Sequence, residues 1–234
     1  MEGKKVTGTH ARKYDKFPIL IKFIDAKKDL SIQVHPDDDY ALKNEGQYGK
    51  TEMWYIMECD EGSFMYYGFS REVSKEELQE RIKNKTLPEV LNKVEVQKAD
   101  VLFIEPGTIH AIGKGNVIAE IQQNSNVTYR VYDYGRKGPD GKDRDLHIEK
   151  ALQVTKTVPI LRKKSFEPHI VSCPYFTVDK LVLDGQHVKK VFGEIYKTSF
   201  VSILVMEGKG TIRDKEETLT FKKRRQPLCH SQYQ

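Results

Sequence analysis

The sequence has few of the features that mark secreted, membrane-bound or strongly charged proteins. Its three cysteines, Cys59, Cys173 and Cys229, are odd in number and unpatterned, which argues against a disulfide framework and favours a reducing cytoplasm. It contains no apolar run of membrane-spanning length and no apolar core of a signal peptide. The 39 lysines and arginines are scattered among 34 acidic residues, which predicts solvated faces rather than a nucleic-acid-binding stripe.

What remains is typical of an ordinary globular protein. The 234 residues are 38% hydrophobic and 31% charged, enough to bury a core as one domain or as two small ones. Short β-type runs separated by turn signals follow one another from Phe17 to Tyr132. This spacing predicts a mainly β protein of the jelly-roll kind.

The stretch from Leu30 to His110 carries several metal-competent side chains on its predicted strands. Alternation places Gln33 and His35 on one face of a strand, and Lys50 and Glu52 on one face of the next. His110 follows a Pro-Gly turn after an apolar strand. Two imidazoles, a carboxylate and an amide oxygen are able to surround one divalent cation and leave positions open for water or substrate. On spacing alone, surface residues or satisfied core polar groups remain an alternative.

Four motifs in this order resemble those of type I mannose-6-phosphate isomerases, in their short bacterial form, within the cupin superfamily. They are Gln-Val-His-Pro-Asp-Asp (33–38), Gly-Lys-Thr-Glu-Met-Trp-Tyr-Ile (49–56), Pro-Gly-Thr-Ile-His-Ala-Ile-Gly (106–113) and Thr-Tyr-Arg-Val-Tyr-Asp-Tyr-Gly-Arg (128–136). The resemblance covers roughly residues 17–214. It implies a cupin-type jelly-roll barrel with a small helical insert and a partial second β unit.

The resemblance also implies a reaction and a site. The expected reaction interconverts mannose 6-phosphate and fructose 6-phosphate through an enediol or enediolate. It implies one zinc ion, or another divalent metal, held by Gln33, His35, Glu52 and His110. Arg130 lies where the family has its catalytic arginine, and a permanently charged guanidinium is suited to clamping oxyanions.

Other roles in the expected site stay open at the level of sequence. Lys50 shares the face of Glu52 and is a candidate for contacting the sugar or its phosphate, although a solvated strand lysine fits the pattern nearly as well. The general base is Glu120, Lys50 or a metal-bound water. Trp54 and Tyr132 are candidates for walls of the pocket, with plain core packing as the alternative.

The chain divides into four predicted segments. Residues 1–16 form an irregular lead-in, 17–160 the metal-binding cupin domain with a helical insert near 74–93, and 161–221 a second, incomplete β domain. Residues 222–234 form an irregular basic tail in which His230 is a bystander. Relative to the family pattern, we expect the chain to be shortened at its N-terminus and aberrant at its C-terminus.

Two other functions compete with the isomerase reading. One is a catalytically inactive sugar-binding or regulatory cupin, because an incomplete second sheet would expose apolar edges and loosen the pocket. The other is a different metal cupin, such as an oxygenase, which would favour iron and a fully histidine-based triad; Gln33 counts against it. The expected partner is a small sugar phosphate, with neither nucleic acid nor membrane.

Overall fold

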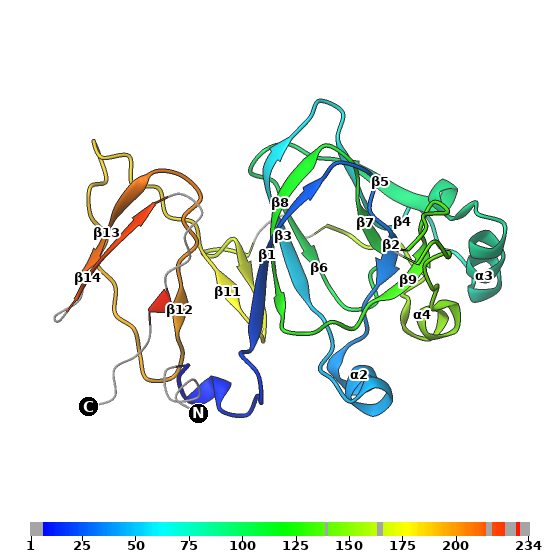
Figure 1. Cartoon of the computed structure of the whole chain (residues 1–234), viewed down its shortest axis with the longest axis horizontal. Coiled ribbons are helices and arrows are strands. Elements are labelled where there is room, and N and C mark those ends of the chain that lie inside the picture. Colours follow the sequence, from blue (N-terminus) through cyan, green and yellow to red (C-terminus); the bar gives the residue numbers. More distant parts are fainter. Residues whose placement is uncertain (1–6, 139, 163–165, 214–216, 223–227, 230–234) are drawn as a thin grey trace. The chain divides into compact units, whose positions relative to one another are not determined.

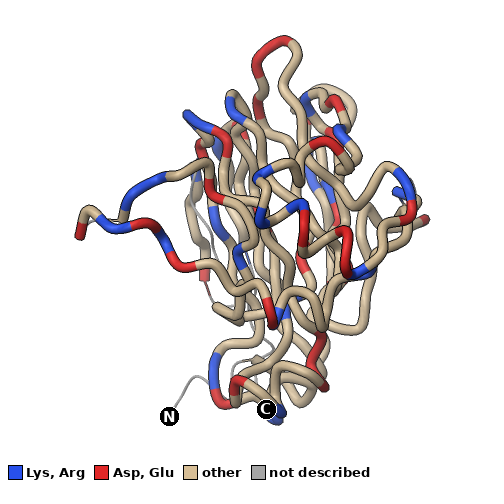
Figure 2. Tube along the Cα trace, turned by 90° about the vertical axis from the view of Figure 1, so that its right-hand side faces the viewer, with Lys and Arg blue, Asp and Glu red and all other residues tan. Residues whose placement is uncertain are grey.

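The computed structural model describes residues 7–138, 140–162, 166–213, 217–222 and 228–229. Contacts divide the chain into two compact units, which are described separately: a larger unit, Ile19–Lys180, and a smaller unit formed by the residues before 19 and after 180. Within the described residues, no helix is long and apolar enough to cross a membrane. Basic and acidic residues are interspersed along the described trace (Figure 2).

The larger unit contains a four-stranded antiparallel sheet with strand order β1-β8-β3-β6 (Figure 1). The strands are β1 (Ile19–Ala26), β8 (Asn116–Gln123), β3 (Glu52–Cys59) and β6 (Val101–Ile104). β1 and β6 begin with apolar, β-branched runs of the kind that predicts a buried strand.

A second antiparallel sheet has five strands in the order β5-β4-β7-β2-β9. The strands are β5 (Leu91–Glu95), β4 (Phe64–Phe69), β7 (His110–Ile112), β2 (Ile32–Val34) and β9 (Tyr129–Tyr132). Together the two sheets give the mainly β, cupin-like fold that the sequence predicted.

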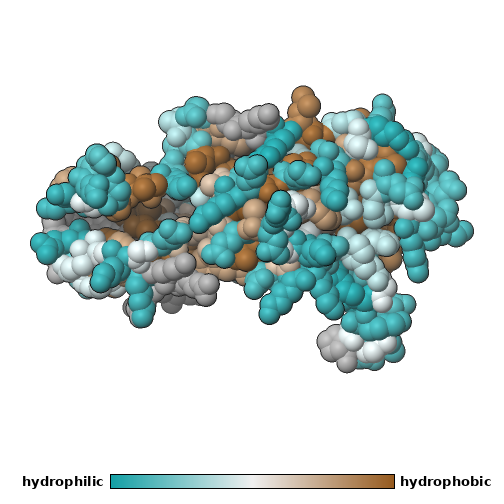
Figure 3. Space-filling model, turned by 90° about the horizontal axis from the view of Figure 1, so that it is seen from above, coloured by the Kyte–Doolittle hydropathy of each residue, from teal (hydrophilic) through white to brown (hydrophobic). Residues whose placement is uncertain are grey.

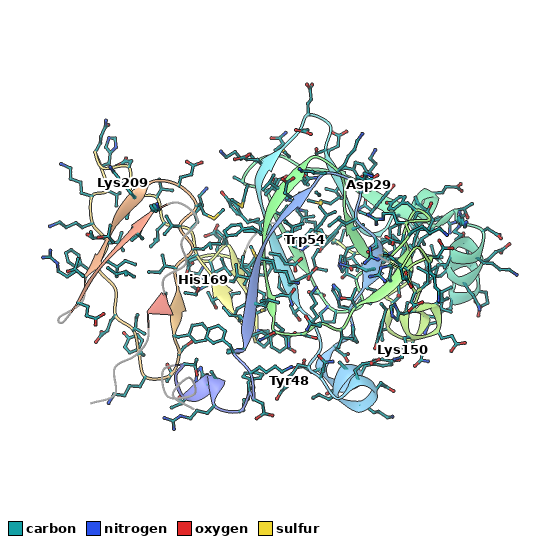
Figure 4. All side chains as sticks on the ribbon, viewed as in Figure 1. Asp29, Tyr48, Trp54, Lys150, His169 and Lys209 are labelled. Atoms are coloured by element: carbon teal, nitrogen blue, oxygen red, sulfur yellow. The ribbon has the colours of Figure 1, made fainter. Side chains whose placement is uncertain are left out.

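The inner faces of both sheets pack on a shared hydrophobic core. This cluster joins Trp54, Ile56 and Leu102 of the four-stranded sheet to Met65, Tyr67 and Ile112 of the five-stranded sheet. Figure 4 shows Trp54 inside the larger unit, among the strands. Burying such aliphatic and aromatic side chains stabilises the fold by about 1.5–3 kcal/mol each.

A second cluster lies between the outer face of the five-stranded sheet and the helices. It contains Ile32 and Val34 of β2 with Leu78 and Ile82 of α3 (Lys75–Lys83) and Ala151 of α4 (Ile148–Val154). Because side chains alternate along a strand, this packing of Ile32 and Val34 turns the intervening Gln33 to the barrel interior.

The helices begin and end at recognisable capping residues. In α2 (Asp38–Glu45), the Asp37 side chain accepts a hydrogen bond from the Tyr40 N–H, and Gly46 ends the helix with φ 63°. In α3 the Ser74 side chain accepts from the Glu77 N–H, as is typical of a serine that precedes a helix. The helical insert predicted up to residue 93 ends earlier: a 3-10 turn, η2 (Leu87–Val90), leads directly into β5. Residues 91–95 are strand because they pair with β4.

The segment 166–180 packs on the outer face of the four-stranded sheet. Its last residue, Lys180, donates from Nζ to the Tyr55 hydroxyl at 2.9 Å. 

The Phe103 and Phe166 rings meet edge to face, with their centroids 5.2 Å apart. The Arg162 guanidinium also donates to the Val101 carbonyl at 2.9 Å. Residues 161–180 therefore belong to the larger unit, which ends at residue 180, whereas the sequence predicted a boundary at 161.

The smaller unit contains short two-stranded pairings. β13 (Lys209–Arg213) pairs with β14 (Thr218–Lys222), and β12 (Val201–Ser202) pairs with β15 (Leu228–Cys229). In the larger unit, β10 (Val171–Ser172) pairs with β11 (Thr177–Val178). The structure differs from the sequence prediction in two places. The lead-in contains a 3-10 turn, η1 (Thr9–Ala11), and β15 lies in the predicted irregular tail. The rest of that tail, including His230, lies outside the described residues.

Large apolar side chains are exposed in the smaller unit. Phe192 is 90% exposed, and Leu181 and Tyr196 are exposed as well. Figure 3 shows apolar areas interrupting a mostly hydrophilic surface. Short strands bury little apolar surface, which accounts for this exposure.

Candidate metal centre

Three strands of the larger unit bring two histidines and a glutamate together in its interior. His35 follows β2, Glu52 begins β3, and His110 begins β7. His110 Nε2 lies 3.3 Å from Glu52 Oε1, and His35 Nε2 lies 3.7 Å from Glu52 Oε2. One ligand atom from each residue lies within 4.8 Å of the others, and all three side chains are buried.

Gln33 adds an amide to this group. It is the register partner of His110 across β2 and β7, and its Nε2 lies 3.3 Å from His110 Nε2. A half-turn of the amide about its last bond would present its oxygen at the same place. The structure therefore brings together all four residues that the sequence analysis predicted as ligands.

Backbone carbonyls orient both imidazoles. His35 Nδ1 lies 3.0 Å from the Val127 carbonyl oxygen, and His110 Nδ1 lies 2.8 Å from that of Thr108. Because a carbonyl can only accept, each Nδ1 carries the proton and each Nε2 keeps its lone pair. This is the tautomer in which histidine binds a metal through Nε2.

The charge states of these residues also suit a divalent cation. Burial, reinforced by the charge of Lys50, lowers the pKa of His35 to about 3, and burial lowers the pKa of His110. Burial alone would raise the pKa of Glu52, but Lys50 and the two histidines outweigh it and hold that pKa well below its usual value. At neutral pH the cluster therefore offers two neutral imidazoles and one carboxylate.

The buried polar atoms of the cluster fit a bound metal. Among the described residues, His35 Nε2 and both Glu52 carboxylate oxygens have no hydrogen-bond partner of regular geometry, although Lys50 Nζ lies 2.8 Å from Oε2. Leaving buried polar atoms unsatisfied is costly. Ligand atoms around a tetrahedral ion with bonds of about 2.0–2.2 Å are separated by about 3.3–3.6 Å, close to the distances between these histidines and Glu52.

Charged side chains continue from the cluster along the inner face of the four-stranded sheet. Lys50 lies 3.9 Å from Glu120 Oε1, and Lys22 Nζ donates to the same carboxylate at 2.9 Å and to the Gln122 amide oxygen at 2.6 Å. Burial, then the charge of Glu52, raises the pKa of Glu120. The pKa of Lys50 is raised because Glu52 and Glu120 outweigh the effect of its burial.

The two aromatic residues expected to wall the pocket lie in different environments. The Trp54 ring meets the His110 ring edge to face at 5.3 Å, and its Nε1 donates to Glu120 Oε2 at 3.1 Å. Tyr132 packs against the cluster between sheet and helices and against Tyr134. Trp54 thus adjoins the candidate centre, whereas Tyr132 belongs to the packing of the helical layer.

Arg130 lies on β9, where its register partner is Gln33. Its guanidinium donates to the Asp145 carbonyl at 3.0 Å, and its Nε is buried without a hydrogen-bond partner in the described part of the chain. Burial, together with the charge of Arg144, lowers its pKa. Arg130 thus neighbours the candidate ligand Gln33 through the β2–β9 pairing.

Sequence reasoning missed Lys22 and Gln122 as neighbours of this centre. Both alternate with apolar residues in strands that otherwise read as buried core, and Lys22 interrupts the run Ile19–Ile24. The Lys22 side chain is 37% exposed, and its ammonium reaches a carboxylate that is only 4% exposed. That partner, Glu120, comes from the paired strand β8, which the sequence does not align with β1.

The fold and this cluster define a cupin-like protein with a candidate metal-binding cluster of two histidines and a glutamate inside its barrel. Comparisons with known proteins identify the family. The family model for the catalytic domain of type I phosphomannose isomerase matches residues 2–66. The chain is 40% identical over 220 residues to mannose-6-phosphate isomerase ManA of Bacillus subtilis, covering 89% of this chain and 68% of that protein. It is 42% identical over 204 residues to the mannose-6-phosphate isomerase of Streptococcus mutans, covering 84% and 63%.

Solved structures agree with these matches. The crystal structure of mannose 6-phosphate isomerase from Bacillus subtilis superposes with a TM-score of 0.76 at 34% identity, covering 92% of this chain and 70% of that one. A variant of phosphomannose isomerase from Salmonella typhimurium has the same fold, with a TM-score of 0.67 at 16% identity. The chain belongs to the type I phosphomannose isomerase family, and it spans about two thirds of the length of the two relatives named above.

Proposed function

We propose that this protein is a metal-dependent aldose–ketose isomerase that interconverts mannose 6-phosphate and fructose 6-phosphate. The observation that carries the proposal is the buried cluster of His35, Glu52 and His110, whose lone pairs converge within 4.8 Å. Family membership supports the substrate, since the relatives are named as mannose-6-phosphate isomerases. We assign the chemistry to the larger unit, because every candidate site residue lies in Ile19–Lys180.

The isomerisation moves a proton between two adjacent carbons of the sugar and shifts the carbonyl between them. A divalent metal bound by the cluster would polarise the sugar oxygens as a Lewis acid. In our proposal Gln33, His35, Glu52 and His110 hold that metal, and zinc suits a set of two imidazoles and oxygen donors. Manganese or iron would also bind such a set, so the assignment to zinc rests on the resemblance and is open to measurement.

The chain's own charged residues would bind and orient the sugar phosphate. The guanidinium of Arg130 stays charged at every working pH and would hold the oxyanion that develops on the sugar. Lys50 lies between Glu52 and Glu120, where its ammonium can donate to a sugar oxygen. Glu120 is a candidate for the base, since its raised pKa brings it closer to the value that proton transfer near neutral pH requires.

A coupled assay on metal-stripped and metal-restored protein tests the function. Mannose 6-phosphate is supplied, fructose 6-phosphate is followed, and bound metal is determined by elemental analysis. We expect no turnover without metal and restored turnover with one equivalent of zinc per chain. Stoichiometric metal without turnover would contradict the isomerase proposal and favour a sugar-binding protein without catalysis.

Matched variants test the site. His110→Ala should lose the metal, whereas His169→Ala, which removes an exposed histidine paired with Asp179, should retain it. Arg130→Ala should retain the metal and lose about 10²–10³-fold in kcat. One full equivalent of metal in His110→Ala would show that the ligands are assigned wrongly.

A cytoplasmic location fits the free Cys59 and Cys173.

A further inference from the structure

Arg130 sits on the edge strand of the five-stranded sheet, and a short segment takes the place of the missing neighbour. β9 is the last strand in the order β5-β4-β7-β2-β9. The Arg130 N–H donates to His147 Nδ1 at 3.2 Å, and the His147 N–H donates to the Arg130 carbonyl at 2.8 Å. The Arg130 guanidinium donates to the Asp145 carbonyl at 3.0 Å.

The imidazole of His147 therefore does what a backbone carbonyl does in a β ladder. A backbone N–H can only donate, so Nδ1 must accept and must be unprotonated. Burial, followed by the charge of Arg130, lowers the pKa of His147 and keeps this lone pair available at neutral pH. Asp145, Lys150 and Glu45 are the other charged groups that act on this ring.

The ring is held on its other side by packing. It lies 6.2 Å from the ring of Tyr129, whose hydroxyl donates to Glu45 at 2.8 Å. Lys150, on α4, donates to the same carboxylate at 2.7 Å. The imidazole thus lies beside a buried tyrosine, which is itself held by Glu45.

His147 is also the N-cap residue of α4, yet its side chain makes no capping hydrogen bond. Serine, threonine, aspartate and asparagine are preferred at this position because they satisfy the first N–H groups of a helix. The side chain of His147 bonds to Arg130 instead, so the choice of histidine is explained by the edge strand rather than by the helix.

We propose that His147 is a positioning residue for Arg130, fixing the edge strand so that its guanidinium is held for the isomerisation. This inference rests on the function proposed above for Arg130. A misplacement of about 1 Å in a catalytic group can cost up to about 10²-fold in rate. Loss of the acceptor should therefore lower kcat with little change in KM, because the arginine contributes mainly in the transition state.

Two substitutions separate the acceptor from the ring. His147→Phe keeps a ring against Tyr129 but removes the acceptor, and His147→Asn offers an oxygen near the place of Nδ1 without the ring. We expect His147→Phe to lower kcat about tenfold and to speed hydrogen exchange at the Arg130 amide about tenfold. His147→Asn should restore both, with one equivalent of metal bound in each variant.

A double variant tests whether the effect passes through Arg130. In an Arg130→Ala background, His147→Phe should cause no further loss of kcat. Unchanged kcat and amide exchange in His147→Phe, or an equal tenfold loss in both backgrounds, would overturn the proposal. A wild-type protein without isomerase turnover would instead refute the proposed function, and amide exchange would still decide whether His147 holds Arg130.

Discussion

Removing the charge of Lys50 should destabilise the metal-free protein much more than the metal-bound protein. The Lys50 side chain is 5% exposed, and its ammonium lies 2.8 Å from one oxygen of Glu52, which is fully buried. Breaking a buried ion pair from one side costs about 3–5 kcal/mol, because the remaining charge is left uncompensated. We expect a loss of this size in the free energy of unfolding of metal-free Lys50→Met.

A bound divalent cation would compensate the same carboxylate, so the cost of Lys50→Met should fall by about 2 kcal/mol or more when metal is present. Urea unfolding with and without chelator measures both values. The single tryptophan, Trp54, lies beside His110 in the larger unit and reports on its unfolding. Lys180→Met is the control, since its exposed ammonium donates to the Tyr55 hydroxyl and lies 5.3 Å from the Tyr55 ring centroid, contacts whose loss should cost less than about 1 kcal/mol. An equal cost with and without metal would refute the idea that metal and lysine share this carboxylate.

Three further predictions concern the scaffold. Gly107→Ala should destabilise the protein by more than about 1–2 kcal/mol in urea unfolding, because φ is +83° and a Cβ would lie 2.8 Å from the Val154 carbonyl oxygen. Unchanged stability would contradict that geometry. Leu78→Ala should cost about 2–5 kcal/mol by the same measurement, since this α3 side chain is 1% exposed, and a cost below 1 kcal/mol would argue against the helical layer. Hydrogen bonds from Arg71 and Arg81 lower the pKa of Glu77 to about 2. The contribution of this carboxylate to stability should therefore be complete above about pH 4.5 and lost as the pH falls toward 2. An NMR titration of Glu77 with a midpoint near 4.5 would be inconsistent with these ion pairs.

Much of the larger unit was predictable because its local patterns agree with its tertiary packing. The strand around Gln33 alternates, and its apolar members Ile32 and Val34 face the helical layer while Gln33 faces the barrel. The cap at Ser74 was likewise readable from neighbouring residues. The helical insert was predicted too long because the pairing of residues 91–95 with β4 overrides their helical spacing.

The sequence by itself determined the mainly β fold, the four candidate ligands and the family. These depend on alternation and on short motifs, which can be recognised without knowing how the strands pair. The tertiary structure decided what depends on pairing between distant strands. It placed Glu52 between two imidazoles, joined Lys22 of β1 to Glu120 of β8, and set His147 against the edge of β9. Contacts such as these link residues 17 to 98 positions apart, and no local pattern in the chain records them.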